Sequence, residues 1–64
     1  MQRWAISLDS EARNRLKPEL LQLGSPVVGP NGEQLLMFRD RFVGLRVASA
    51  ARTSLRPLKG RSAA

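Results

Sequence analysis

The sequence predicts a small single domain of the α+β class, on three observations. Residues 3–8 alternate apolar and polar side chains, and residues 10–23 repeat apolar side chains every three or four positions. Residues 33–47 hold two further apolar runs that follow a clear turn. We expect the order β-α-β-β-β, with antiparallel hairpins packed on one helix. The predicted domain covers residues 1–55, and residues 56–64 are expected to be a flexible basic tail.

Residues 3–8 are the first predicted strand. Trp4, Ile6 and Leu8 fall on one face at a period of two, and the residues between them fall on the other. This pattern is typical of a strand with one buried face. We expect Trp4 to belong to the core, in preference to the interface role that tryptophan often takes.

A helix is predicted next, starting at Asp9 or Ser10, because either side chain can accept a hydrogen bond from a free N–H group of the first turn. Pro18 interrupts this helix and would remove one hydrogen bond, at a cost of about 3 kcal/mol. Two arrangements remain open: one helix over residues 10–23 with a kink, or two short helices with Pro18 at the first position of the second. The apolar stripe keeps its phase through Pro18, which favours the kinked helix; its members are Ala12, Leu16, Leu20, Leu21 and Leu23.

Residues 29–32 form the clearest turn of the chain, Gly-Pro-Asn-Gly, between a short strand at residues 26–28 and a longer one at residues 33–39. In the longer strand both faces are apolar, with Leu35 and Met37 on one and Leu36 and Phe38 on the other. One helix cannot cover both faces of this strand. The sequence therefore predicts a homodimer or an obligate partner.

A last strand is predicted at residues 42–47, paired with the preceding strand as a hairpin, since Val43, Leu45 and Val47 alternate with other residues. The connection Asp40-Arg41 is not a favoured two-residue turn. Residues 48–55 fit either a short helix or an extension of that strand.

The net charge of +6 lies entirely in the C-terminal part of the chain. Residues 1–40 contain five basic and five acidic side chains, whereas residues 41–64 contain six basic and no acidic side chains. Such asymmetry indicates a polyanionic partner. The candidate nucleic-acid-binding residues are Arg41, Arg46, Arg52, Arg56, Lys59 and Arg61.

The residue types that most enzymes and metal sites need are missing. The chain has no histidine and no cysteine, which removes the commonest general base and the soft metal ligands. We therefore expect no enzymatic activity, no catalytic or metal-binding residues and no cofactor. The apolar runs are too short for a secretory signal or a membrane span, so we expect a cytoplasmic protein with no membrane partner.

Two function classes remain. The first is a nucleic-acid-binding accessory or regulatory protein that contacts the phosphates of DNA or RNA through its arginine-rich C-terminal third. The second is a non-catalytic interaction module, an inhibitor or adaptor that docks on a larger acidic protein. Phe38 and Phe42 could stack on bases if both lay on an open sheet face, although a place in the core is the stronger expectation for both.

Overall fold

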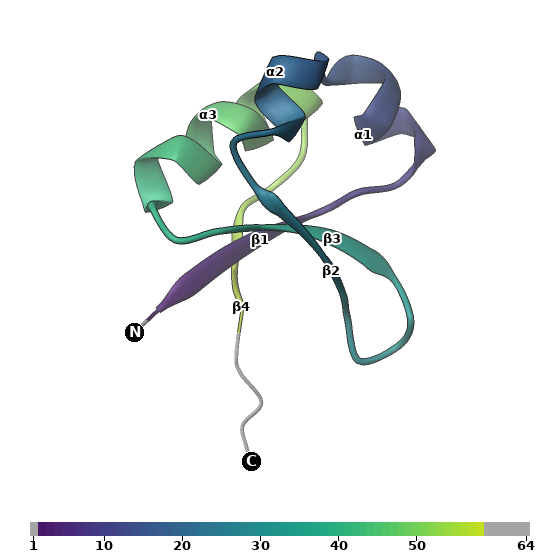
Figure 1. Ribbon diagram of the computed structural model, residues 1–64, viewed down its shortest axis with the longest axis vertical. Coiled ribbons are helices and arrows are strands. Elements are labelled where there is room, and N and C mark those ends of the chain that lie inside the picture. The colour runs from purple at the N-terminus through teal and green to yellow at the C-terminus, as the bar shows by residue number, and fades with distance from the viewer. Residues whose placement is uncertain (1, 59–64) are drawn as a thin grey trace.

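Four antiparallel strands and three helices make up residues 2–58, which are the residues that this computed structural model describes (Figure 1). The α+β class and the single small domain are therefore confirmed. The order of elements differs from β-α-β-β-β, because the first helical region is divided and a helix replaces the last predicted hairpin strand. In chain order the elements are β1 (Arg3–Ser7), α1 (Ser10–Arg15), α2 (Pro18–Leu21), β2 (Ser25–Val28), β3 (Gln34–Phe38), α3 (Arg41–Ala51) and β4 (Arg56–Leu58).

The strands form one sheet in the order β2-β3-β1-β4, in which all neighbours are antiparallel. Between β1 and β3, Trp4 lies opposite Phe38 and Ile6 opposite Leu36. All the described helices lie on one side of this sheet, and we call the other side the helix-free face (Figure 1). With α1 and α2 taken as one connection, the order βαββαβ is that of ferredoxin-like folds, which host many unrelated functions.

Pro18 divides the first helical region into two helices, so the preferred kinked helix is wrong and the two-helix alternative is correct. The residue before a proline is pushed out of the helical region of backbone space, and Lys17 is extended with ψ 155°. Pro18 then occupies the start of α2, where its missing N–H group is not needed. The predicted start is confirmed, since the Asp9 carboxylate accepts a hydrogen bond of 2.9 Å from the Ala12 N–H.

Residues 42–47 belong to a helix, and the predicted strand there is wrong. The buried residues of α3 are Gly44, Val47, Ala48 and Ala51, a spacing that fits 3.6 residues per turn. Asp40 starts the helix, because its side chain accepts a hydrogen bond of 2.8 Å from the Phe42 N–H. Asp40-Arg41, which would make a poor hairpin turn, is thus the N-terminal cap and the first residue of α3.

The core lies between the sheet and the helices. Ile6, Leu36 and Phe38 point to the helices from the two central strands, and Trp4 packs on the edge of this cluster. From the helices come Ala12, Leu16, Val47, Ala48 and Ala51. Trp4 thus packs with the core, as expected, while remaining half-buried.

The folded part of the chain extends past the predicted boundary at residue 55. Arg56, Pro57 and Leu58 form β4 and pair with Ala5, Trp4 and Arg3 of β1. The first three residues of the predicted tail are therefore a sheet strand. The rest of that tail, residues 59–64, lies outside the described residues.

Candidate nucleic-acid interface

The predicted binding residues of the C-terminal third do not form one patch. Arg41, Arg46 and Arg52 are all exposed but are spread along α3 and its C-terminal cap, and a rise of 1.5 Å per residue separates the first from the last by about 16 Å. Arg56 lies in β4. Lys59 and Arg61 lie outside the described residues.

Arg41 lies against the aromatic ring of Trp4. Its guanidinium carbon is 5.4 Å from the ring centroid, within the range of a cation–π contact. The ring holds this arginine at the end of the sheet where β1 begins and α3 starts. A guanidinium held in this way keeps its charge and part of its hydrogen-bonding edge available for an anion.

Two arginines from residues 1–40, the part of the chain with no net charge, lie at the same end of the sheet. Arg3 and Arg39 are the chain neighbours of the paired residues Trp4 and Phe38. Arg3 also lies opposite Leu58, two residues from Arg56 on the same face of β4. Arg56 itself lies opposite Ala5, and its guanidinium donates a hydrogen bond of 3.3 Å to the Ser7 hydroxyl, further along β1. Arg3, Arg39, Arg41 and Arg56, all exposed, are named the arginine cluster below.

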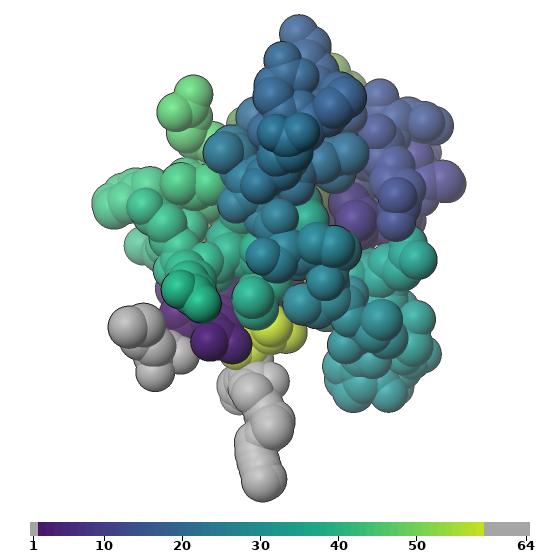
Figure 2. Space-filling model, viewed as in Figure 1, coloured from purple at the N-terminus to yellow at the C-terminus, as the bar shows by residue number. Residues whose placement is uncertain are grey.

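The arginine cluster has few acidic neighbours. Asp40 is the nearest acid in the chain, and one of its carboxylate oxygens is engaged as the cap of α3. Glu33 accepts a hydrogen bond from the Asn31 N–H at the turn between β2 and β3, a turn that stands out from the body of the molecule (Figure 2). The other acids, Asp9, Glu11 and Glu19, belong to the cap and first turns of α1 and α2. Positive charge is therefore concentrated where β1 begins.

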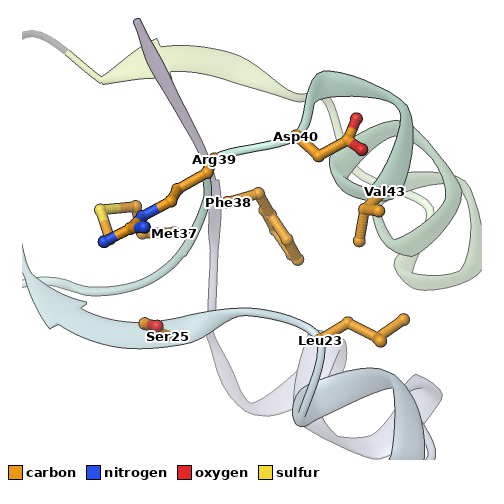
Figure 3. A pocket seen from close by; sticks show the side chains of 7 residues that line it. All are labelled: Leu23, Ser25, Met37, Phe38, Arg39, Asp40 and Val43. Atoms are coloured by element: carbon orange, nitrogen blue, oxygen red, sulfur yellow. The ribbon is translucent and has the colours of Figure 1, made fainter. Parts of the chain in front are cut away.

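Three of the clustered arginines border the helix-free face. Arg3 and Arg56 alternate with residues that face the helices or the sheet edge, and Figure 3 shows Arg39 pointing away from Phe38. The same face has a hollow of about 220 Å³, which is lined by Ala5 and Leu35 and by the charged residues Arg56 and Glu33. An anionic chain that crosses this face would meet guanidinium groups at one end and an apolar floor in the middle.

The helix-free face is not an aromatic stacking platform. The stronger expectation, a place in the core, is confirmed for Phe38 and wrong for Phe42. Phe38 is only 2% exposed and faces the helices. Phe42 is exposed, but it lies on α3 rather than on a strand. Any contact with bases on this face would involve aliphatic side chains such as Met37, which lacks the flat surface that makes stacking strong.

Sequence reasoning missed Arg3 and Arg39 because charges were summed along the chain. In the sum they are offset by acids such as Asp9 and Glu11, which the fold places on the helices. The alternation of residues 3–8 did place Arg3 on the face opposite Trp4. The pairing of β1 with β3 and β4 was the missing information.

Within residues 2–58, no group of three or more acidic side chains lies close enough to hold a metal ion. No helix among these residues is long and apolar enough to cross a bilayer. Comparisons with protein-family models, curated proteins and solved structures find no match for this chain.

Proposed function

We propose that this protein is a non-catalytic nucleic-acid-binding accessory or regulatory protein whose arginine cluster contacts phosphates. The observation that carries the proposal is the placement of Arg3, Arg39 and Arg41 at one end of the sheet, with Arg56 further along the helix-free face. Four exposed guanidinium groups outnumber the nearby acids Asp40 and Glu33 and create a local positive potential that attracts a polyanion.

Arginine suits this role better than lysine does. Its planar fork can donate two parallel hydrogen bonds to one phosphate. Each phosphate that is neutralised releases a condensed counterion, so the affinity must fall as salt rises. The basic residues after the cluster in sequence, Lys59 and Arg61, would extend the same contact along the backbone of the nucleic acid.

The sugar-phosphate backbone is the part of the nucleic acid that these residues fit. Phosphate contacts position a protein without reading sequence, and the helix-free face presents aliphatic groups rather than a hydrogen-bonding pattern for bases. We therefore propose binding with little sequence preference. A cytoplasmic location belongs to the same proposal and is supported only by the composition, which lacks cysteine.

The test is a fluorescence-anisotropy titration of labelled duplex and single-stranded oligonucleotides at a series of salt concentrations. The double variant Arg3→Ala, Arg56→Ala should lower the slope of log affinity against log salt by about 1.8 on duplex DNA, from about 0.9 per lost contact. The matched control is Arg13→Ala, Lys17→Ala, which removes the same charge from α1 and its C-terminal flank. If both double variants lowered the salt slope equally, net charge alone would explain the effect, and the assignment of binding to the arginine cluster would be contradicted.

A second arm of this titration measures the contribution of Lys59 and Arg61. A chain that stops after Leu58 keeps β4 and its pairing with β1, whereas a chain that stops before Arg52 would lose that strand and Leu55, which packs on the core. We expect the chain ending at Leu58 to fold and to bind with a smaller salt slope. An unchanged slope would limit the site to the arginine cluster.

A further inference from the structure

The outward side of α3 carries large apolar side chains that the fold leaves in contact with solvent. Phe42 is 75% exposed and Leu45 is 42% exposed. In a chain whose aromatic residues are only Trp4, Phe38 and Phe42, one phenylalanine is thus placed outside the core. Isolated exposed apolar side chains are ordinary, but adjacent ones on one helix mark an interaction surface.

A groove continues this surface towards α2. It has a volume of about 310 Å³ and lies between the segment that joins α2 to β2 and the start of α3. Phe38 and Val43 point towards it from one side, and Leu23 lies across from them (Figure 3). Leu23 is itself 53% exposed, so apolar side chains stand on both walls of the groove. Ser25, Arg39 and Asp40 also line it. Figure 2 shows α3, in green, open at the surface beside α2, in blue.

Positive charges flank the apolar stripe on both sides. At 100° per residue, Arg41 lies about 40° to one side of Leu45, and Arg46 lies about 40° to the other side of Phe42. The helix from Arg41 to Ala51 contains no acidic residue. Asp40, just before it, uses its carboxylate as the helix cap. This surface therefore carries an excess of positive charge, which an acidic partner would complement.

We propose that this α3 surface, formed by the groove together with Phe42, Leu45, Arg41 and Arg46, docks an acidic amphipathic segment of a partner protein. An apolar side chain of that segment enters the groove between Leu23 and Val43, and its neighbours pack on Phe42 and Leu45. Carboxylates one helical turn apart reach Arg41 and Arg46. This is the helix-in-groove mode of recognition, with apolar anchors at helical spacing.

A second copy of this chain fits the surface less well. A two-fold interface places a patch against itself. Asp40 is the one acid among the residues that line the groove or form α3, and its carboxylate already caps α3, so the arginines of two copies would outnumber their acidic partners. A nucleic acid also fits poorly, because the aliphatic side chains Leu23 and Leu45 give bases no ring to stack on. The two proposed sites share Arg41, and Arg39 lines the groove. Their tests stay separate, because the nucleic-acid test removes Arg3 and Arg56, which border the opposite face of the sheet.

The test uses the full chain and a labelled 15-residue peptide of leucine, phenylalanine and glutamate at helical spacing. One control peptide has glutamine in place of glutamate, and another has only glutamate and alanine. We expect saturable binding of the first peptide by anisotropy, with NMR shift changes centred on residues 42–46. Phe42→Ala should weaken that binding by about tenfold or more, as expected for an aromatic anchor. Val28→Ala, which removes a 73% exposed side chain elsewhere, should leave binding unchanged.

Several results would overturn the proposal. Equal binding of the glutamate–alanine peptide would mean that charge alone acts, and equal binding of the glutamine peptide would mean that the arginines do not act. Shift changes at β1 and β4 would move the contact to the helix-free face. Self-association that Phe42→Ala abolishes would assign the surface to a second copy, and oligonucleotide shifts centred on Phe42 would assign it to nucleic acid. A thermal melt of Phe42→Ala checks that the fold is kept.

Discussion

At the scale of single residues, Gly44 decides how closely α3 approaches the rest of the core. A Cβ atom added there would lie 2.9 Å from Leu55 Cδ1 and 3.3 Å from Phe38 Cδ2. Glycine normally weakens a helix interior by about 1 kcal/mol relative to alanine. Its presence in the middle of α3 is therefore explained by the close contact and not by any special backbone angle.

Gly44→Leu should lower the free energy of unfolding by about 1–3 kcal/mol, because the added side chain overpacks the space between α3 and Leu55. Ala50→Leu is the matched control, since Ala50 is exposed on the same helix and the added group points to solvent. Urea unfolding followed by circular dichroism measures both. Equal stabilities for the two variants would contradict the packing of α3 described above.

The contact between Arg41 and Trp4 links the core to the surface. Trp4 packs on the core cluster, while its ring lies below the guanidinium of an exposed arginine. One residue thus serves the fold and also positions a charge of the arginine cluster. The interface role and the core role are compatible for this side chain, although the sequence pattern presented them as alternatives.

At the scale of elements, α3 depends on its cap. Asp40 has an extended backbone and its side chain accepts from the Phe42 N–H, which is the usual role of aspartate before a helix. The far end closes at Arg52, the one non-glycine residue with positive φ among residues 2–58. Its φ of 57° and ψ of 44° are those of a left-handed C-terminal cap.

Asp40→Ala should therefore destabilise the protein by about 1 kcal/mol, whereas Asp40→Asn should keep most of the stability because asparagine caps nearly as well. Urea titration gives both values. If residues 42–47 formed a hairpin strand, neither substitution would remove a helix cap, and the two variants would not separate in this way.

At the scale of the whole molecule, the covering of β3 bears on the number of chains in solution. The homodimer was predicted because both faces of this strand are apolar. Leu35, on the helix-free face, is only 4% exposed within one chain, so that face does not need a second chain to bury it. Both edge strands also contain a proline, Pro26 in β2 and Pro57 in β4, and proline weakens edge-to-edge pairing.

We accordingly expect sedimentation velocity to give a monomer across the micromolar range, with a melting temperature that does not depend on protein concentration. A dimer in that range, or a melting temperature that rises with concentration, would favour the homodimer that the pattern of β3 indicates. The Phe42→Ala variant separates association through α3 from association through the sheet.

The features of this chain that depend on local chemistry can be predicted from its residues alone. Period-two alternation identified β1, and the apolar run after the turn identified β3. The side chain of Asp9 identified the start of α1, and the glycine and proline residues of 29–32 identified the turn. The effect of Pro18 is also local, and the rule for the residue before proline would have selected two helices. Tertiary packing determines that residues 42–51 form a helix, because their sequence fits two periods. Val43, Leu45 and Val47 alternate as in a strand, while Gly44, Val47, Ala48 and Ala51 share one face of a helix. Only packing on β1 and β3 distinguishes these patterns. The tertiary structure also decided the arginine cluster, since strand pairing sets which charges are neighbours and a sum along the chain does not.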